Sequence, residues 1–396
     1  MCDTPLTESS GESPNMAHTP VTLANARFVL PNEVHDGWLL VEDGRIAALG
    51  TGNPPPGPVH DLNGAWVAPG LVDTHVHGGI GHAFTEADPE AAGRIAAFNR
   101  SQGVTSMVGG LVAATPEDTL RQVSALAELC ESGELAGIYL EGPFIARSKC
   151  GAHDPDLLRE PDTDEFDRWL TAGRGHVRMI TVAPELPGAL DLIHAAASSG
   201  VVVAVGHTES CYEQTLAAFD AGATVATHLY NAMRPMNHRD PGPVAAALHD
   251  ERVTVELIAD NVHVHPGAGR LVFSAAGAGR VSLVTDAMSA TGLGDGQYTL
   301  GNLRVRVQGG EARLVENGAI ASSTIVLPQA VRNAVTDHGA TLPDAVRSAS
   351  CVPARSLGID AGRIEAGAPA DLLVFADDLS VGRAMHRGEW LADGVS

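Results

Sequence analysis

The sequence predicts an α/β protein built on a (β/α)8 TIM barrel, with a small β-sandwich domain formed by both chain ends. Two observations support this fold. The long centre of the chain alternates apolar, β-branched runs with Ala-, Leu- and Glu-rich stretches at intervals of roughly 25 to 40 residues. Both ends instead have short apolar runs that are separated by turns. Eight alternating units are typical of a parallel barrel whose strands are each followed by a helix.

The eight apolar runs are the expected barrel strands. They are Leu71–Val76, Val104–Val108, Leu135–Leu140, Val177–Val182, Val201–Val205, Thr224–Thr227, Val253–Ile258 and Val281–Val284. Stretches such as Pro116–Cys130 and Gln214–Ala221 are expected to be the helices between them. An open doubly wound sheet is the competing arrangement, but it would require a Gly-rich phosphate loop after the first strand, and the sequence has none there.

The two ends of the chain predict one β unit. Apolar runs lie on either side of Glu42-Asp43-Gly44, and this pattern is a hairpin signal. A similar texture returns near the C-terminus, in the run Ala370–Phe375. We therefore expect a barrel domain over 69–358, a β-sandwich domain from 19–68 and 359–396, and a disordered tail over 1–18, which is rich in Ser, Thr, Pro and Glu.

Composition excludes several functional classes. The net charge of −23 over 396 residues argues against sequence-independent binding of nucleic acid or of an anionic membrane. An anionic substrate would need local positive groups. The sequence has no apolar run near the roughly 20 residues that span a bilayer, and no signal peptide. Five scattered Cys without Cys-x-x-Cys spacing predict reduced thiols and a cytoplasmic location.

The first barrel strand ends in a pair of histidines. Pro69-Gly70 marks a turn, and the strand that follows it ends in His75-Val76-His77. Side chains two residues apart on a strand point to the same face, so both imidazoles can bind one cation. By itself, the His-x-His pattern is equally compatible with two hydrogen-bonded histidines.

Four further strand ends bear imidazoles or carboxylates, namely Glu141, His207, His228 and Asp286. Each has an ordinary explanation. Glu141 could pair with Arg147 or be solvated, His207 could cap a helix, His228 could be a core residue, and Asp286 could be an N-cap. Catalytic residues of these barrels, however, lie at the C-terminal ends of strands. Because these residues share one barrel mouth, we expect a site for Zn²⁺ or a related divalent ion.

At this point the chain resembles a known family. The order His-x-His…His…His…Asp is similar to that of the amidohydrolase superfamily, and several segments closely resemble its N-acetylglucosamine-6-phosphate deacetylase family. These segments are Glu141–Phe144, Gly151–His153, Gly206–Thr208, Thr227–Met233 and Leu283–Ala287. Where many superfamily members have a carboxylated Lys, this chain offers Glu141, which favours the deacetylases over dihydroorotase-like or hydantoinase-like readings.

The resemblance implies a divalent metal cofactor, with one or two ions per subunit. Residues matching Glu141, His207 and His228 hold the principal metal in that family. Because His75 and His77 are also present, a second ion bridged by Glu141 fits the sequence. Zinc is the expected metal, and iron, manganese and cobalt are alternatives.

The resemblance also implies the reaction. It is hydrolysis of the acetamide of N-acetyl-D-glucosamine 6-phosphate to D-glucosamine 6-phosphate and acetate, in amino-sugar catabolism and cell-wall recycling. Metal-bound hydroxide attacks the carbonyl, and Asp286 acts first as general base and then as general acid.

The expected substrate contacts follow from the same resemblance. Arg239 is expected to reach the active site of the neighbouring subunit of a homodimer, where its planar guanidinium can bind two phosphate oxygens. Ser322 stands where the family pattern has Gly. The full set of expected contacts is Ala152, His153, Asn231, Ala232, Arg239, His263, Ile320, Ala321 and Ser322.

Two other functions remain compatible with these residues. One is a deacylase or cyclic-amide hydrolase that acts on an uncharged substrate, for which charge reversal at Arg239 would hardly change KM. The other is a metal-dependent binding or scaffold protein without turnover, although such a protein would have no need of a base at Asp286.

Overall fold

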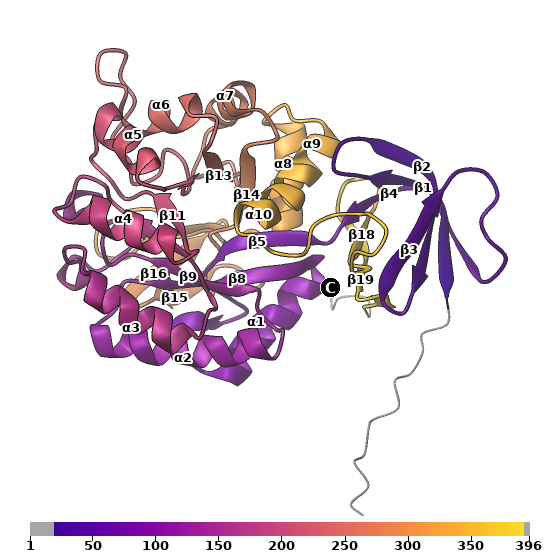
Figure 1. The fold of residues 1–396 in the computed structure, drawn as a ribbon, viewed down its shortest axis with the longest axis horizontal. Helices are drawn as coiled ribbons and strands as arrows, with labels where there is room; N and C mark the ends of the chain where they lie inside the picture. Colours follow the sequence, from indigo (N-terminus) through magenta and orange to yellow (C-terminus); the bar gives the residue numbers. More distant parts are fainter. Residues whose placement is uncertain (1–19, 392–396) are drawn as a thin grey trace, which may run out of the picture.

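The computed structural model describes residues 20–391. The predicted tail, 1–18, lies outside the described residues. Figure 1 shows a parallel barrel surrounded by helices, with a separate sheet at one end of the molecule that combines the first strands of the chain with the last ones. No helix among the described residues has the length and apolar character needed to cross a membrane.

The barrel contains eight parallel strands, as the sequence predicted. The strands are β5 (Leu71–Val76), β8 (Val104–Val112), β9 (Gly137–Glu141), β10 (Val177–Val182), β11 (Val202–Val205), β12 (Val225–Ala226), β13 (Thr254–Ile258) and β14 (Val281–Val284). The barrel closes where the ends of its two edge strands, β14 and β5, meet. There, Asp286 N donates to His75 O at 2.9 Å, and His77 N donates to Ala287 O at 2.8 Å. His75, His77 and Asp286 therefore lie where the two edge strands of the sheet meet and close the barrel.

Each barrel strand is followed by a helix. Pro89 and Pro116 occupy first-turn positions of the first two, and Asp88 and Thr115 are their N-caps, which is a favourable start for a helix. The eight helices are α1 (Pro89–Ser101), α2 (Pro116–Glu131), α3 (Thr163–Gly173), α4 (Ala189–Ser198), α5 (Tyr212–Asp220), α6 (Gly242–His249), α7 (Pro266–Ala276) and α8 (Leu327–Thr336). Two more, α9 (Leu342–Ser348) and α10 (Cys351–Ser356), lead back to the end sheet.

The end sheet is one seven-stranded mixed sheet, in the order β20-β19-β18-β4-β1-β2-β3. The predicted hairpin is present, and Asp43 and Gly44 in its turn have φ values of 48° and 73°, as a tight type I′ turn requires. The strands are β1 (Val21–Val29), β2 (Val34–Glu42), β3 (Arg45–Gly50), β4 (Val59–Pro69), β18 (Leu372–Phe375), β19 (Val381–His386) and β20 (Glu389–Trp390).

A third, three-stranded sheet lies between β14 and α8, and the sequence analysis did not anticipate it. Its strands are β15 (Gly296–Leu300), β16 (Leu303–Gln308) and β17 (Glu311–Leu314). The alternating pattern of β16 and the Gly309-Gly310 turn are ordinary hairpin signals that could have revealed it. Its inner face packs against Val112 and Met288. The sheet thus adds a wall beside the barrel mouth.

Candidate active site

Three of the strand-end residues have left-handed backbone conformations. The φ values are 48° at His207, 26° at His228 and 49° at Asp286. A non-glycine residue in this region costs roughly 1–2 kcal/mol, so the surrounding structure must hold it there. Strain of this kind clusters at functional sites.

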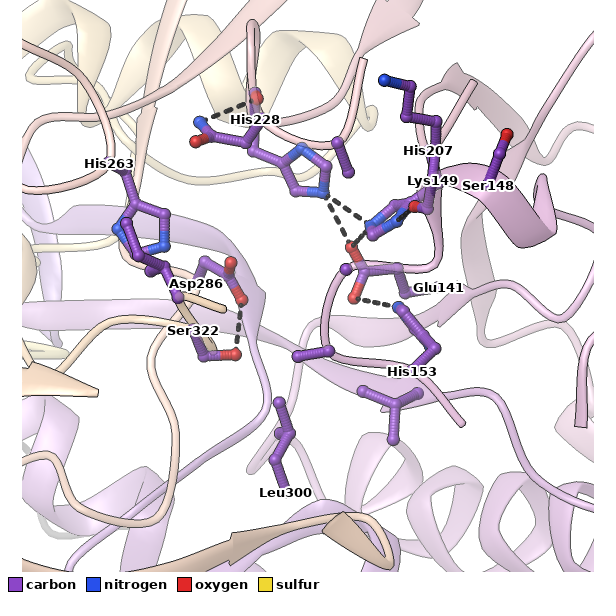
Figure 2. Close-up of a pocket in the computed structure, with 16 residues that line it drawn as sticks. Glu141, Ser148, Lys149, His153, His207, His228, His263, Asp286, Leu300 and Ser322 are labelled. Atoms are coloured by element: carbon purple, nitrogen blue, oxygen red, sulfur yellow. Dashed lines mark hydrogen bonds and ion pairs between the residues drawn. The ribbon is translucent and has the colours of Figure 1, made fainter. Parts of the chain in front are cut away.

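A cavity of about 320 Å³ opens at this end of the barrel. Figure 2 shows Asp286 and Ser322 on one side of it, and Glu141 and His153 on the other. The cavity is lined by Val112, Glu141, Ser148, Lys149, Gly151, Ala152, His153, His207, His228, Asn231, Ala232, His263, Asp286, Leu300, Ile320 and Ser322.

Glu141, His207 and His228 converge on one point. The Nε2 atoms of the two imidazoles lie 3.0 Å apart, and Glu141 Oε1 is 3.1 Å from that of His207 and 2.9 Å from that of His228. All three side chains are buried. The structure thus brings together the three residues that, by the resemblance, would hold the principal metal.

The protonation of His207 tests whether a metal fits. Its Nδ1 donates to the carbonyl oxygen of Lys149 at 2.7 Å, because a carbonyl can only accept. The neutral ring therefore has a lone pair at Nε2, which faces the acceptor oxygen of Glu141. A cation held by both of these acceptors would make their close approach favourable. Two imidazoles and a carboxylate are also ligands that suit Zn²⁺ and related ions.

His75 and His77 form a second group beside the first. Their Nε2 atoms are 3.1 Å apart, and Asp286 Oδ1 lies 3.6 Å from His75 Nε2 and 3.3 Å from His77 Nε2. Glu141 Oε2 is 3.1 Å from His77 Nε2, so the Glu141 carboxylate faces both groups. This position of Glu141 is compatible with two neighbouring cations.

His75 is oriented by a carboxylate deeper in the barrel. Its Nδ1 donates to Glu256 Oε2 at 3.2 Å, which leaves a lone pair at Nε2. Glu256 also accepts from the hydroxyl groups of Thr227 at 2.7 Å and Thr74 at 3.2 Å. A carboxylate behind an imidazole ligand is a recurring arrangement at metal sites, where it fixes the tautomer and the ring orientation.

Neighbouring imidazoles keep the carboxylates of Glu141 and Asp286 ionised. Burial alone would raise the pKa of Glu141, but the imidazoles of His75, His153, His207 and His228 around it hold that pKa well below its usual range. The pKa of Asp286 is likewise lowered, by His75 and His77 against the effect of burial. In the opposite direction, burial would lower the pKa of His77, but Asp286 and Glu141 raise it to about 9.

His153 differs from the other histidines. Ligand atoms of Glu141, His153 and His207 all lie within 4.8 Å of one another. However, the amide of Ala113 donates to His153 Nδ1 at 3.2 Å, so the neutral ring has its proton on Nε2, which is 3.3 Å from Glu141 Oε2. Burial lowers the pKa of His153 and keeps it neutral. His153 is thus arranged as a hydrogen-bond donor rather than as a metal ligand.

At another part of the wall, His263 lies next to Asp260. Its Nδ1 is 2.6 Å from Asp260 Oδ2. Burial would lower the pKa of His263, but this hydrogen bond and the charges of Asp260 and Asp286 together outweigh burial and raise the pKa. Asn231 and Ala232, which the resemblance gives as phosphate contacts, also line the cavity.

Two of the expected substrate residues do not line the cavity of this chain. Arg239 is exposed, and its Nη1 lies 3.0 Å from His238 Nε2. Ala321 is fully buried behind Ile320 and Ser322, which do line the cavity.

Sequence reasoning missed several residues of the site, among them Val112, Leu300 and Glu256. Val112 and Leu300 form an apolar part of the wall, where β8 meets the unexpected small sheet. Glu256 had a detectable signal, since a carboxylate inside the apolar run Val253–Ile258 must find a partner when it is buried. The other two are ordinary apolar residues, and their sequence context does not mark them.

Comparison with known proteins agrees with this geometry. Residues 66–391 match the model of the amidohydrolase family. An N-acetylgalactosamine-6-phosphate deacetylase from Escherichia coli O157:H7 is 37% identical over 92% of this chain and 97% of its own length. An N-acetylglucosamine-6-phosphate deacetylase from Vibrio furnissii is 36% identical over 83% of each chain.

A solved structure is also similar over nearly the whole chain. It is a mutant of N-acetyl-D-glucosamine-6-phosphate deacetylase from Mycobacterium smegmatis, in complex with N-acetyl-D-glucosamine-6-phosphate. It is 47% identical, has a TM-score of 0.91, and covers 94% of this chain and 99% of its own. The barrel, the convergent histidines and carboxylates and these matches together show that the chain belongs to the amidohydrolase family.

Proposed function

We propose that this protein hydrolyses the acetamide of N-acetyl-D-glucosamine 6-phosphate and releases D-glucosamine 6-phosphate and acetate, as a step of amino-sugar catabolism. The observation that carries the proposal is the convergence of Glu141, His207 and His228 opposite Asp286 in one cavity. The names and bound ligand of the similar proteins supply the substrate class.

Glu141, His207 and His228 would hold a divalent metal, and His75 and His77 would hold a second one with Glu141 between them. The chemistry that such a metal supplies is polarisation of the amide carbonyl and a lowered pKa for a water molecule. Zinc suits the mixed set of imidazoles and carboxylates, and iron, manganese and cobalt are the alternatives.

Asp286 would transfer the proton, and His153 would stabilise the negative charge on the carbonyl oxygen. Asp286 is ionised, so it can accept a proton from the attacking water and then donate it to the amine nitrogen as the C–N bond breaks. His153 has its proton on Nε2, so it can donate a hydrogen bond to the carbonyl oxygen as negative charge develops there.

The phosphate group would lie near Asn231, Ala232 and His263. Lys149 is the only Lys or Arg that lines the cavity among the described residues, and its Nζ is 3.0 Å from Glu209 Oε1. A phosphate therefore needs a further cation in a chain whose net charge is −23. We propose that the exposed Arg239 of a second subunit supplies it in a homodimer.

The division of the chain into domains is part of this proposal. A barrel domain over 69–358 would perform the chemistry, and 19–68 with 359–396 would form the β domain, of which residue 19 and 392–396 lie outside the described residues. The end sheet has a hydrophobic core of its own, which supports this division. This core includes Leu23, Phe28, Leu39, Ile46, Leu372 and Met385. The described Cys residues are all free, which is compatible with work in the cytoplasm.

The direct test is incubation of the metal-loaded protein with N-acetylglucosamine 6-phosphate and measurement of acetate. The galactosamine epimer and unphosphorylated N-acetylglucosamine are the comparison substrates. We expect the highest kcat/KM for the phosphorylated glucosamine derivative. Absence of acetate from both phosphorylated sugars would refute the proposal.

Charge reversal at Arg239 tests the phosphate contact. We expect Arg239→Glu to raise KM for the phosphorylated substrate. Its activity on unphosphorylated N-acetylglucosamine should equal the weak activity of the native protein on that sugar. Arg252→Glu is the control, since Arg252 is an exposed cation that pairs with Asp220 and Asp250 away from the cavity. Equal KM values for the native protein and Arg239→Glu would argue against the dimer contact.

A further inference from the structure

The segment after β17 runs beside the proposed base. Ser323 N donates to Asp286 O at 2.8 Å, and Met288 N donates to Ser323 O at 3.1 Å. This parallel pairing extends the closing edge of the barrel by one short stretch. It brings Ser322 next to Asp286, although 36 residues separate the two in the sequence.

The Ser322 hydroxyl contacts only one oxygen of the Asp286 carboxylate. Its Oγ donates to Oδ1 at 3.1 Å, as the dashed line in Figure 2 shows. His77 Nε2 and His75 Nε2 also face Oδ1, at 3.3 and 3.6 Å. None of the described residues forms a hydrogen bond or ion pair with Oδ2. The two carboxylate oxygens are therefore in different surroundings.

The backbone at Ser322 would suit glycine better. Its φ is 58°, in the left-handed region, where a side chain is unfavourable. The side chain is only 8% exposed, and its one hydrogen bond goes to Asp286. A residue kept in an unfavourable conformation, with its only polar group on the proposed base, indicates a functional constraint.

We propose that Ser322 is a positioning residue that fixes the rotation of the Asp286 carboxylate and so makes Oδ2 the oxygen that exchanges the proton. This inference rests on the proposed role of Asp286. The final torsion of an aspartate is soft, so without an anchor its two oxygens exchange places easily. With Oδ1 anchored, Oδ2 can take the proton of the attacking water and return that same proton to the amine nitrogen.

Two substitutions at Ser322 distinguish the effect of its hydroxyl group from the effect of its backbone conformation. Ser322→Gly removes the hydroxyl and relieves the left-handed conformation, whereas Ser322→Ala removes the hydroxyl and keeps that conformation. We expect both to lower kcat about tenfold, with KM changed by less than about twofold. We also expect Ser322→Gly to unfold at or above the native temperature, and Ser322→Ala not above it. Metal content per subunit should equal that of the native protein in both.

Ser289→Ala is the matched control. Ser289 is also buried near the mouth, but its hydroxyl donates to the carbonyl oxygen of Thr299 at 3.1 Å and does not contact Asp286. Its kcat should stay near the native value. The measurements are acetate release from N-acetylglucosamine 6-phosphate, thermal unfolding, and metal analysis of each purified variant.

The outcomes are distinguishable. A native protein that releases no acetate contradicts the proposed function itself. An active native protein with an equally active Ser322→Gly variant overturns only the role of Ser322. Loss of kcat in proportion to lost metal or lost thermal stability, in both variants, would make Ser322 a structural residue and would also overturn the inference.

Discussion

The two histidine groups at the barrel mouth are oriented by different kinds of partner. His75 lies on strand β5, and its Nδ1 donates a hydrogen bond to the side chain of Glu256 on β13. His207 follows β11, and its Nδ1 donates a hydrogen bond to the backbone carbonyl of Lys149, which lies in a loop. One group thus depends on a replaceable side chain inside the barrel, and the other on the path of a loop. Single substitutions can therefore disturb the orientation of His75 more readily than that of His207.

The largest effect should come from removing one histidine ligand from each group. We expect His207→Asn to lose the metal bound between Glu141 and His228, and with it turnover down to the background rate. His75→Asn removes a ligand only from the second group, so it should keep the first metal and part of the activity. Metal content and acetate release measured side by side check this. Equal losses in the two variants would show that the groups do not act separately.

The next largest effect should come from Asp286, whose carboxylate faces His75 and His77 from the side of the cavity opposite Glu141 (Figure 2). Asp286→Asn keeps the shape of the side chain but removes the proton acceptor. We expect kcat to fall about 10³-fold while the metal content stays native. The measurement is single-turnover acetate release with metal analysis. Native turnover in this variant would refute the assignment of Asp286 as base.

A smaller effect should follow from changing the support of one group alone. Glu256→Gln removes the buried charge behind His75, and we expect about tenfold weaker metal binding in the His75 group, with the Glu141 group unaffected. Competition with a chelator measures both affinities. Lys149→Ala is the counterpart on the other side, since it keeps the backbone carbonyl that orients His207. If Lys149→Ala weakened metal binding as much as Glu256→Gln, the contrast between the two supports would fail.

The smallest effect concerns His263, which is supported by Asp260 much as His75 is supported by Glu256. The raised pKa of His263 means that its charged form persists above the ordinary value of 6.5. Its stabilising contribution is therefore complete below pH 6.5 and is lost as the pH rises through the raised pKa. If the imidazolium binds phosphate, KM should rise a few-fold as the pH passes through this raised pKa.

Asp260→Asn tests this dependence. It removes the carboxylate that raises the pKa of His263, so the rise in KM should begin at a lower pH than in the native protein. The unphosphorylated sugar is the control, because its KM should not follow His263. A KM for the phosphorylated sugar that is unchanged across this pH range would exclude a phosphate contact at His263.

Much of the candidate site could be predicted because it depends on local periodicity. The alternation of strands and helices fixed the barrel, and parallel strands place their C-terminal ends at one mouth. His75 and His77 share a face because they are two residues apart. His207, His228 and Asp286 follow strands that the sequence marks by apolar runs. Convergence of these residues needed no knowledge of side-chain contacts.

Other parts of the site could not be predicted in this way. The role of Glu256 depends on contact with His75, which lies 181 residues away in the chain. The wall made by Leu300 depends on how a small inserted sheet packs against β8. Whether Arg239 lines the cavity of its own chain depended on the course of an exposed loop. Each of these depends on packing between distant segments, which a local pattern does not encode.

By itself, the sequence determined the strand-helix alternation, the identity of the ligands and the end of the barrel where they gather, because short-range periodicity sets which way a side chain points. Only the tertiary structure decided which nitrogen of each histidine has a free lone pair and which oxygen of Asp286 is left open. Those properties depend on single hydrogen bonds between segments that meet only when the barrel closes.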